Sequence, residues 1–235
     1  MSKYDPIFYS ENAGEDESVL CPVCGRQLIN NPADQLWELD FIDADLRVHT
    51  VQDDILDDWL IMCPACFYID HDFRHVPEKR AELAAFVQSE KYLSLFPDNN
   101  PSTRELFSVY LILQTMLQAP PILIADIHQR LCWIFEDDND KPRASFHRGK
   151  AIEFYEKAAQ RSGNDPAVTQ LIWYLLANLY RRSGAFKKAK QILLNLNTEK
   201  ERYHKLYLFQ KQLIDAKDCS APPLPGKELF YDNDA

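Results

Sequence analysis

The later two thirds of the chain repeat one pattern, in which apolar residues recur every three or four positions between breaks marked by proline or glycine. That spacing gathers apolar side chains on one face of an α-helix. It predicts seven helices, over about residues 77–96, 102–117, 122–135, 144–161, 165–183, 186–196 and 199–215. Because the turns between them are short, neighbouring helices should be antiparallel and form a stack of α-hairpins.

Local signals indicate where two of these helices begin. Ser102 has Glu105 three residues after it, which is the pattern of a capping box. Asp165 followed by Pro166 is a capping residue followed by a proline suited to the first helical turn. Gly184 is suited to end that second helix, because glycine adopts a positive φ without strain.

The first third of the chain has a different pattern. Leu36–Phe41 alternates partly between apolar and polar residues, and Trp59–Met62 is a short apolar run. Both predict short strands. We therefore expect a mainly α fold, with a small N-terminal β module over residues 19–76 followed by a helical domain over residues 77–216.

The two ends of the chain are expected to lack regular structure. Residues 1–18 are polar and acidic, and we expect a disordered arm. Residues 217–235 are expected to be a flexible tail, because the proline-rich run Ala221–Gly226 cannot continue a helix. Glu228–Tyr231 is a short apolar segment that could dock in a groove of a neighbouring chain.

One predicted helical pair has the residue spacing of a tetratricopeptide repeat. The positions that carry it are Trp173, Leu176, Ala177, Tyr180, Gly184, Phe186, Ala189 and Leu193. Small residues at two of them would let the helices cross closely. The pair before it fits less well, since the turn ahead of Ala151 is too long for the repeat. The simpler alternative is an ordinary amphipathic hairpin.

Composition and length exclude a membrane-spanning class. The chain has 235 residues, of which 46% are hydrophobic, and only six are glycine, which favours helix over sheet. No apolar run approaches the ~18–20 residues that span a bilayer, and the first residues hold no apolar signal segment. We expect a soluble cytoplasmic protein with no membrane partner.

Charge is distributed unevenly along the chain. Residues 1–140 hold 9 basic and 26 acidic side chains, whereas residues 141–211 hold 15 basic and 5 acidic ones. This polarity indicates either internal electrostatic docking or a positively charged binding face, and ordinary solvated surface is the plain alternative. The segment between Asp34 and Asp58 is so acidic that it would repel phosphates, which disfavours DNA binding there.

Two CPxC motifs in the first third carry the clearest chemistry. Their cysteines are Cys21, Cys24, Cys63 and Cys66, with 38 residues between the two pairs. Each motif presents two thiolates from one tight turn, and two such turns complete a tetrahedron around zinc. Four thiolates leave no position for a water, so the pattern predicts one structural zinc ion in a zinc-ribbon-like module.

The cysteines and histidines of the chain allow other roles besides structural zinc binding. A CPxC motif also occurs in thiol–disulfide redox proteins, but there it opens a helix after a strand, a pattern not seen here. Cys132 falls inside an apolar helical pattern and should be a small buried residue, while Cys219 should be a free thiol. His71 and His75 are four residues apart and could ligate a second metal, although solvent-facing histidines are the plainer interpretation.

A partner-binding groove is predicted on the helix that carries the repeat pattern. Tyr174, Asn178, Arg181 and Arg182 share one face at helical spacing. An asparagine followed by arginines resembles the clamp that some tetratricopeptide domains use for a peptide carboxylate, which the guanidinium fork binds well. The alternative is that both arginines simply favour the C-terminal end of the helix.

The order of these parts resembles that of an uncharacterised bacterial family, a domain of unknown function. It pairs a CPxCG ribbon with tetratricopeptide-like helices, and the residues that carry the resemblance here lie in Cys21–Gly25, Trp59–Cys66 and Tyr174–Ala189. The resemblance covers most of residues 19–216 and implies no known reaction. Phe67 departs from it, because the family has a second glycine there.

No motif for a phosphate loop, nucleophile elbow or dinucleotide site is present. We therefore expect a non-catalytic scaffold with one structural zinc and a tetratricopeptide-like groove for another protein or an acidic peptide. The alternatives are an RNA- or nucleic-acid-associated protein that uses the basic helical half, and a redox or metal enzyme that uses the CPxC thiols.

Overall fold

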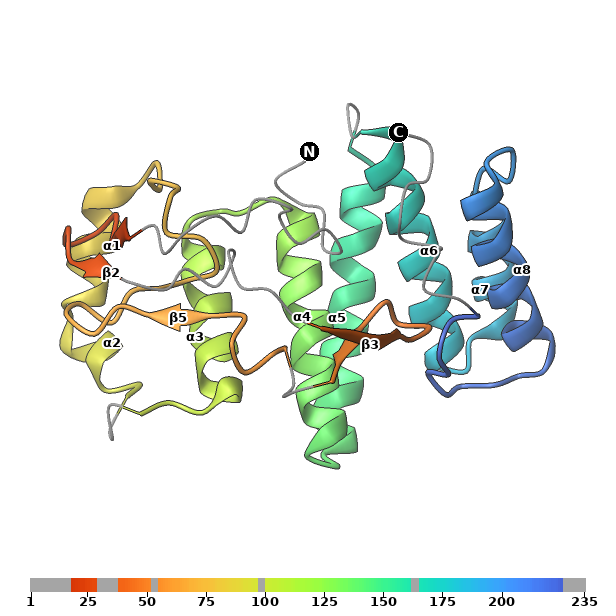
Figure 1. The fold of residues 1–235 in the computed structure, drawn as a ribbon, viewed down its shortest axis with the longest axis horizontal. Helices are drawn as coiled ribbons and strands as arrows, with labels where there is room; N and C mark the ends of the chain where they lie inside the picture. Colours follow the sequence, from red (N-terminus) through yellow and green to blue (C-terminus); the bar gives the residue numbers. More distant parts are fainter. Residues whose placement is uncertain (1–17, 29–37, 52–54, 97–99, 162–164, 226–235) are drawn as a thin grey trace. The chain divides into compact units, whose positions relative to one another are not determined.

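The computed structural model describes residues 18–28, 38–51, 55–96, 100–161 and 165–225 (Figure 1). Within these ranges the fold is mainly helical, with eight helices and three small pairs of antiparallel strands. The predicted fold class, mainly α with small N-terminal strands, is confirmed. Residues 1–17 of the arm predicted over residues 1–18, and the segment 226–235, lie outside the described ranges.

The chain divides into two compact units. Of the described residues, one unit contains 18–28, 38, 55–96 and 100–119, and we call it the cysteine unit. The other contains 39–51, 120–161 and 165–225, and we call it the helical unit. This division differs from the expected boundaries at residues 76 and 77 in two respects, each with its own physical cause.

The first difference is that the early helices belong with the cysteines. The cysteine unit holds α1 (Arg80–Val87), α2 (Glu90–Leu93) and α3 (Thr103–Met116). Their apolar side chains complete its core, in which Leu83, Tyr92 and Phe107 are fully buried. Residues 19–76 carry the two CPxC turns, which we call the knuckles (Cys21–Gly25 and Cys63–Phe67). This segment has too few apolar residues to close a hydrophobic core without the three helices.

Local capping signals decide the bounds of these early helices. The expected helix over residues 77–96 is split, because Ser89 caps a second helix by accepting a hydrogen bond from the backbone N–H of Tyr92. The predicted capping box of α3 is confirmed. The Ser102 side chain accepts from the backbone of Glu105, whose carboxylate accepts from the Ser102 N–H at 2.8 Å.

The second difference is that a hairpin between the two knuckles belongs to the helical unit. Strand β3 (Leu39–Ile42) pairs with β4 (Val48–Thr50) in antiparallel fashion. Ile42 and Leu46 are buried in the same hydrophobic core as the later helices. The hairpin therefore derives its stability from the helical unit rather than from its neighbours in sequence.

Five helices complete the helical unit: α4 (Pro121–Asp137), α5 (Lys141–Ala159), α6 (Pro166–Arg182), α7 (Phe186–Leu193) and α8 (Glu201–Asp215). Each packs against the next, and α6 also contacts α8. Asp165 caps α6 with Pro166 in its first turn, and Gly184 follows it at φ +74°, as predicted. Ala177 and Ala189 are buried where α6 crosses α7. The identity of this hairpin as a tetratricopeptide repeat stays a prediction.

The beginning of the expected flexible tail, which we call the tail segment (residues 217–225), is packed on the helical unit. The N–H of Leu224 donates to the carbonyl of Ile42 at 2.8 Å, and the Leu224 side chain is buried. The expectation of a tail that is flexible from residue 217 is thus wrong for these residues. The edge of β3 supplies backbone partners that a proline-rich segment can use without being helical.

Candidate metal centre

Two short hairpins of the cysteine unit each end in a tight turn that carries two cysteines. In the first, β1 (Val19–Leu20) pairs with β2 (Gln27–Leu28). The turn closes through two backbone hydrogen bonds, from Gly25 N–H to the Cys21 carbonyl and from Cys21 N–H to the Arg26 carbonyl, both 2.8 Å long. Cys21 and Cys24 therefore project from one rigid turn.

The second hairpin repeats this arrangement. Strand β5 (Ile61–Met62) pairs with β6 (Ile69–Asp70) in the equivalent register. The N–H of Phe67 donates to the Cys63 carbonyl and that of Cys63 to the Tyr68 carbonyl, again at 2.8 Å. The two knuckles thus have the same hydrogen-bonding scheme although they are far apart in sequence.

Phe67 occupies the position that glycine occupies in the first knuckle. Its φ is +61°, close to the +77° of Gly25, so the turn is the same with a residue that resists it. Two contacts hold the phenylalanine there. Its ring stacks on Phe96 with a centroid separation of 6.1 Å, and its carbonyl accepts from the Tyr92 hydroxyl at 2.6 Å. The departure from the expected glycine is therefore accommodated by packing from α2 and the residues after it.

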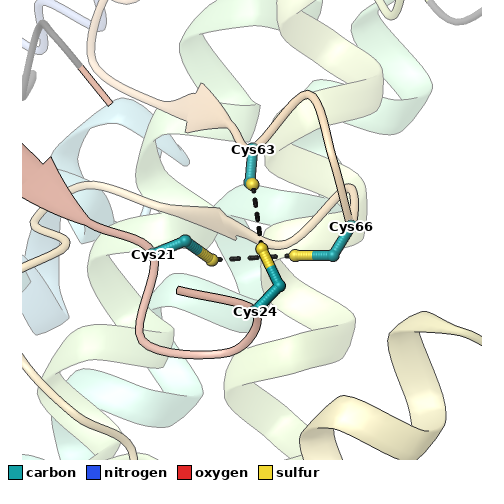
Figure 2. Close-up of side chains that lie close together, drawn as sticks. All are labelled: Cys21, Cys24, Cys63 and Cys66. Carbon is teal, nitrogen blue, oxygen red and sulfur yellow. Dashed lines mark hydrogen bonds between the residues drawn. The ribbon is translucent and has the colours of Figure 1, made fainter. Parts of the chain in front are cut away.

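The four cysteine sulfurs converge on one point, as Figure 2 shows. The Sγ atoms of Cys21 and Cys66 are 3.6 Å apart, and those of Cys24 and Cys63 are 3.7 Å apart. All four ligand atoms lie within 4.8 Å of one another. Each of the two short distances joins one knuckle to the other, so the hairpins face each other across the cluster.

These distances fit a metal ion and not a disulfide. A Zn–S bond of about 2.3 Å places the sulfurs of a regular tetrahedron about 3.8 Å apart. A disulfide would bring two sulfurs to about 2.05 Å, whereas all four cysteines are free thiols. The side chains already present thus outline a four-coordinate site that needs little rearrangement to accept a metal.

Burial and hydrogen bonding separate the thiols in acidity. The hydrogen bond with Cys66 lowers the pKa of Cys21 to about 5, and raises the pKa of Cys66 itself. Burial raises the pKa of Cys63. Cys24 is the only exposed member of the cluster. A bound cation would replace these shared protons, because thiols bind metal as thiolates.

A half-buried carboxylate, that of Asp70, lies beside the second knuckle but is engaged in other contacts. Asp70 accepts hydrogen bonds from the hydroxyls of Tyr68 and Tyr110 and, at 2.8 Å, from the N–H of His71. Burial raises its pKa. These contacts tie β6 to α3, so the residue positions the knuckle and does not join the cluster.

The two histidines after the second knuckle form no metal site. The ring of His71 stacks on Trp59 at 4.4 Å, and its Nδ1 lies 3.1 Å from the Trp59 carbonyl oxygen. His75 is half exposed and pairs with Asp72 at 3.6 Å. Across the ranges that the structure describes, the four cysteines are the only group of three or more side chains placed to hold a metal.

The remaining cysteines lie as expected. Cys132 is buried on α4, and that burial raises its pKa to about 12. Cys219 is an exposed free thiol in the tail segment. Neither belongs to the cluster.

The predicted groove residues do share one face of α6, but that face is covered within the helical unit. Tyr174, Asn178 and Arg181 are no more than 1% exposed. The Tyr174 hydroxyl donates to the Ala44 carbonyl at 3.1 Å, and Asn178 donates to the carboxylate of Asp45 at 2.7 Å. The expectation of an open groove is therefore wrong for this structure, because the hairpin and the tail segment occupy the face.

Asp45 is the residue that sequence reasoning missed. It lies at 4% exposure, and its carboxylate also accepts from the Trp133 Nε1 at 3.2 Å and approaches the Nε of Arg182 at 3.3 Å. In the sequence it is one of many aspartates in an acidic segment, so nothing local sets it apart. The uneven charge distribution along the chain is the one sequence feature that points to it. The contact between Asp45 and Arg182 shows that some of the acidic and basic side chains pair inside the protein.

In the described ranges, no helix is both long and apolar enough to cross a membrane. A family model described as an uncharacterized protein conserved in bacteria (DUF2225) matches residues 15–217. No curated protein and no solved structure matches the chain.

Proposed function

The chain belongs to the DUF2225 family of bacterial proteins, and we propose that it is a non-catalytic scaffold, stapled by one structural zinc ion, that binds another protein. One observation carries the metal part of this proposal. It is the cluster of Cys21, Cys24, Cys63 and Cys66, whose sulfurs match the edges of a tetrahedron around zinc.

The softness and number of the thiolate ligands restrict which metal the site can bind and indicate a structural role for it. Four soft sulfur ligands in a tetrahedron favour zinc or an iron–sulfur centre over magnesium or calcium. A closed set of four protein ligands leaves no coordination position for a water or a substrate, which is the arrangement of structural zinc sites. The ion would hold two hairpins together whose strands are only two residues long.

A redox role for the CPxC thiols has less support. In such a motif the attacking thiolate must be accessible, and it is usually the first cysteine. Here the first cysteines, Cys21 and Cys63, are 1% and 0% exposed. Nucleic-acid binding by Arg181 and Arg182 is disfavoured as well, since Arg181 is fully buried and Arg182 is engaged with Asp45 and Glu136.

The scaffold part rests on the succession of helices from α4 to α8. Helical hairpins that stack in order give a long surface that is suited to binding other proteins. Apolar side chains remain on that surface. Phe146 on α5 and Leu208 on α8 are 58% and 49% exposed. Nothing on this surface favours an acidic partner through Arg181 and Arg182, because both side chains are engaged inside the helical unit.

The metal is tested by elemental analysis of protein purified without added metal. We expect about one zinc per chain for a four-thiolate site. Cys63→Ser should lose the zinc, while the matched control Cys219→Ser, outside the cluster, should keep it. Negligible zinc in the unaltered chain, with the four thiols of Cys21, Cys24, Cys63 and Cys66 titrating freely under native conditions, would refute the site.

The scaffold role is tested by cross-linking and affinity capture from the host bacterium, with partners identified by mass spectrometry. Phe146→Asp and Leu208→Asp should reduce recovery of a specific partner while zinc content and helical signal stay unchanged. If no partner is recovered by the unaltered chain, or if a catalysed reaction is found, the proposed role is wrong.

A further inference from the structure

The tail segment follows α8 and runs across the C-terminal end of α6 to the edge of β3. Its backbone carbonyls at Asp218 and Ser220 accept hydrogen bonds from Arg181 at 2.6 and 2.7 Å. The Cys219 carbonyl accepts from Arg182 at 2.6 Å. Three consecutive carbonyls of the segment, at the turn that follows α8, are thus held by two neighbouring guanidinium groups.

Arg181 is itself fixed in position for this contact. Its Nε donates to the Gln210 side chain at 3.1 Å, and its second terminal nitrogen donates to Asn178 at 2.6 Å. The guanidinium is fully buried, although no carboxylate hydrogen-bonds to it in the described structure. The backbone carbonyls of the tail segment supply the partners that a buried arginine requires.

Beyond the arginines, the segment adds to the hairpin as an edge strand does. The Ala44 N–H donates to the Pro222 carbonyl at 2.9 Å, and the Leu224 N–H donates to the Ile42 carbonyl at 2.8 Å. Pro223 forms a bridge with Asp43. Prolines suit the place, because they lack an N–H and hold the chain extended.

A single side chain anchors the segment. Leu224 is 8% exposed and belongs to the hydrophobic core that contains Tyr174 and Ile214. Pro223 and Pro225, on either side of it, are exposed. Main-chain contacts plus one apolar anchor are the usual means by which proteins recognise extended peptides at the edge of a sheet.

We propose that the surface formed by the Arg181–Arg182 end of α6 and the edge of β3 is a peptide-binding site, which the tail segment occupies in cis. The ligand class is an extended segment with a leucine after two prolines, supplied by a partner protein that displaces the tail. This inference rests on the proposed scaffold function and names the binding site for it. Since most contacts are to the main chain, a partner segment of this pattern could make the same ones.

Because the tail segment is covalently attached, it competes strongly with a free peptide for the site. A segment joined to its site by a short link has an effective concentration on the order of millimolar. A free peptide that binds the empty site with a low micromolar Kd would therefore bind the tethered protein on the order of 100-fold more weakly, and a weakening of at least about 10-fold is the minimum expected. Peptides that bind weakly or lack the matching sequence would therefore not displace the tail segment from the site.

The experiment frees the site without altering the residues that form it. A protease cleavage sequence is inserted between Ala216 and Lys217, the folded protein is cut, and the released tail is removed by gel filtration. A fluorescent peptide of residues 217–225 is then titrated against cut and uncut protein under reducing conditions. The matched control is the same peptide with Leu224→Asp, so the two peptides are compared on one and the same protein.

We expect the native peptide to bind the cut protein and to bind the uncut protein at least about 10-fold more weakly. The Leu224→Asp peptide should bind neither. The inference is overturned if a cut protein with unchanged circular dichroism and zinc content does not bind the peptide, or if cut and uncut protein bind it equally. It is also overturned if the helical unit unfolds when the tail leaves, since the segment is then an integral strand.

Failure here can be told apart from failure of the scaffold function. A partner captured equally by cut and uncut protein keeps the scaffold role but places its binding surface elsewhere. Zinc content is measured independently of the tail and does not depend on either result.

Discussion

Asn178 donates a hydrogen bond to the carboxylate of Asp45 at 2.7 Å, and its own carbonyl oxygen accepts one from Arg181 at 2.6 Å. The neutral amide thus lies between a buried acid and a buried base. Asn178 and Arg181 are fully buried and Asp45 nearly so, which means that no water replaces any of these contacts. These polar contacts hold the turn of the β3–β4 hairpin in the helical unit and give most of its buried polar atoms a hydrogen-bond partner.

Asp45→Asn should therefore destabilise the helical unit strongly. The change keeps the shape but removes the negative charge that faces Arg182 at 3.3 Å, and breaking a buried pair costs about 3 kcal/mol. Urea unfolding followed by circular dichroism measures the effect. The control is Asp215→Asn, whose carboxylate forms ion pairs with Lys190 and Lys211 at the surface and should matter little. Equal effects of the two variants would contradict the assignment.

The two knuckles offer a test of backbone strain at the proposed metal site. Phe67→Gly and Phe67→Val both remove the ring that stacks on Phe96, but only valine keeps a side chain at φ +61°. The difference between them isolates the cost of the left-handed conformation, about 1–2 kcal/mol. We expect zinc affinity, measured by competition with a chelator, to be about 10-fold lower for the valine variant. Equal affinities would mean that the turn does not need a positive φ.

Stability should fall in mild acid because of two histidines that face each other. Nδ1 of His128 on α4 lies 2.9 Å from Nδ1 of His147 on α5, so one donates and the other accepts while both are neutral. Burial lowers the pKa of His128 to about 4 and lowers that of His147.

An unfolded histidine titrates near pH 6.5, so below that pH the unfolded chain binds protons that the folded one does not. Stability contributed by the neutral pair is present above pH 6.5 and is lost progressively as pH falls toward about 4. Urea midpoints measured between pH 7.5 and 4.5 should fall more steeply for the unaltered chain than for His128→Phe. Parallel slopes would show that the pair is not protonated on unfolding.

Removing the proposed zinc ion should increase local unfolding in the cysteine unit and leave the helical unit unchanged. The knuckle amides of Gly25 and Phe67 are hydrogen-bonded only within their own turns, so chelation should raise their hydrogen-exchange rates. Amides in the middle of α6, which packs on α5, α7 and α8, should exchange as before. Exchange measured by mass spectrometry on peptic fragments separates the regions. Uniform loss of protection would mean that the chain unfolds as one cooperative body.

Features encoded by neighbouring residues were predictable from the sequence. The knuckles, the capping box at Ser102 and the Asp165–Pro166 helix start each depend on a few consecutive positions, and each is present. The helical periodicity likewise gave the correct class of fold, since an apolar stripe has few alternatives to a packed helix.

What could not be predicted depends on contacts between distant positions. Asp45 meets Asn178, and Leu224 meets Ile42, with no periodic signal at either end of the pair. The same gap explains the error about the groove. Helical spacing correctly put Tyr174, Asn178 and Arg181 on one face, but it holds no information on what covers that face.

The position of the β3–β4 hairpin has a consequence for the order of biosynthesis. Asp45 leaves the ribosome more than a hundred residues before Asn178, and the Gln210 side chain that approaches the Ala44 carbonyl follows later still. Contacts of such long range cannot form during early translation. We expect the polar groups of the nascent hairpin to lack their hydrogen-bond partners, and to be accessible to chaperones, until α8 and the tail segment have left the ribosome. The four knuckle cysteines, by contrast, would be able to bind the proposed metal as soon as Cys66 has left the ribosome.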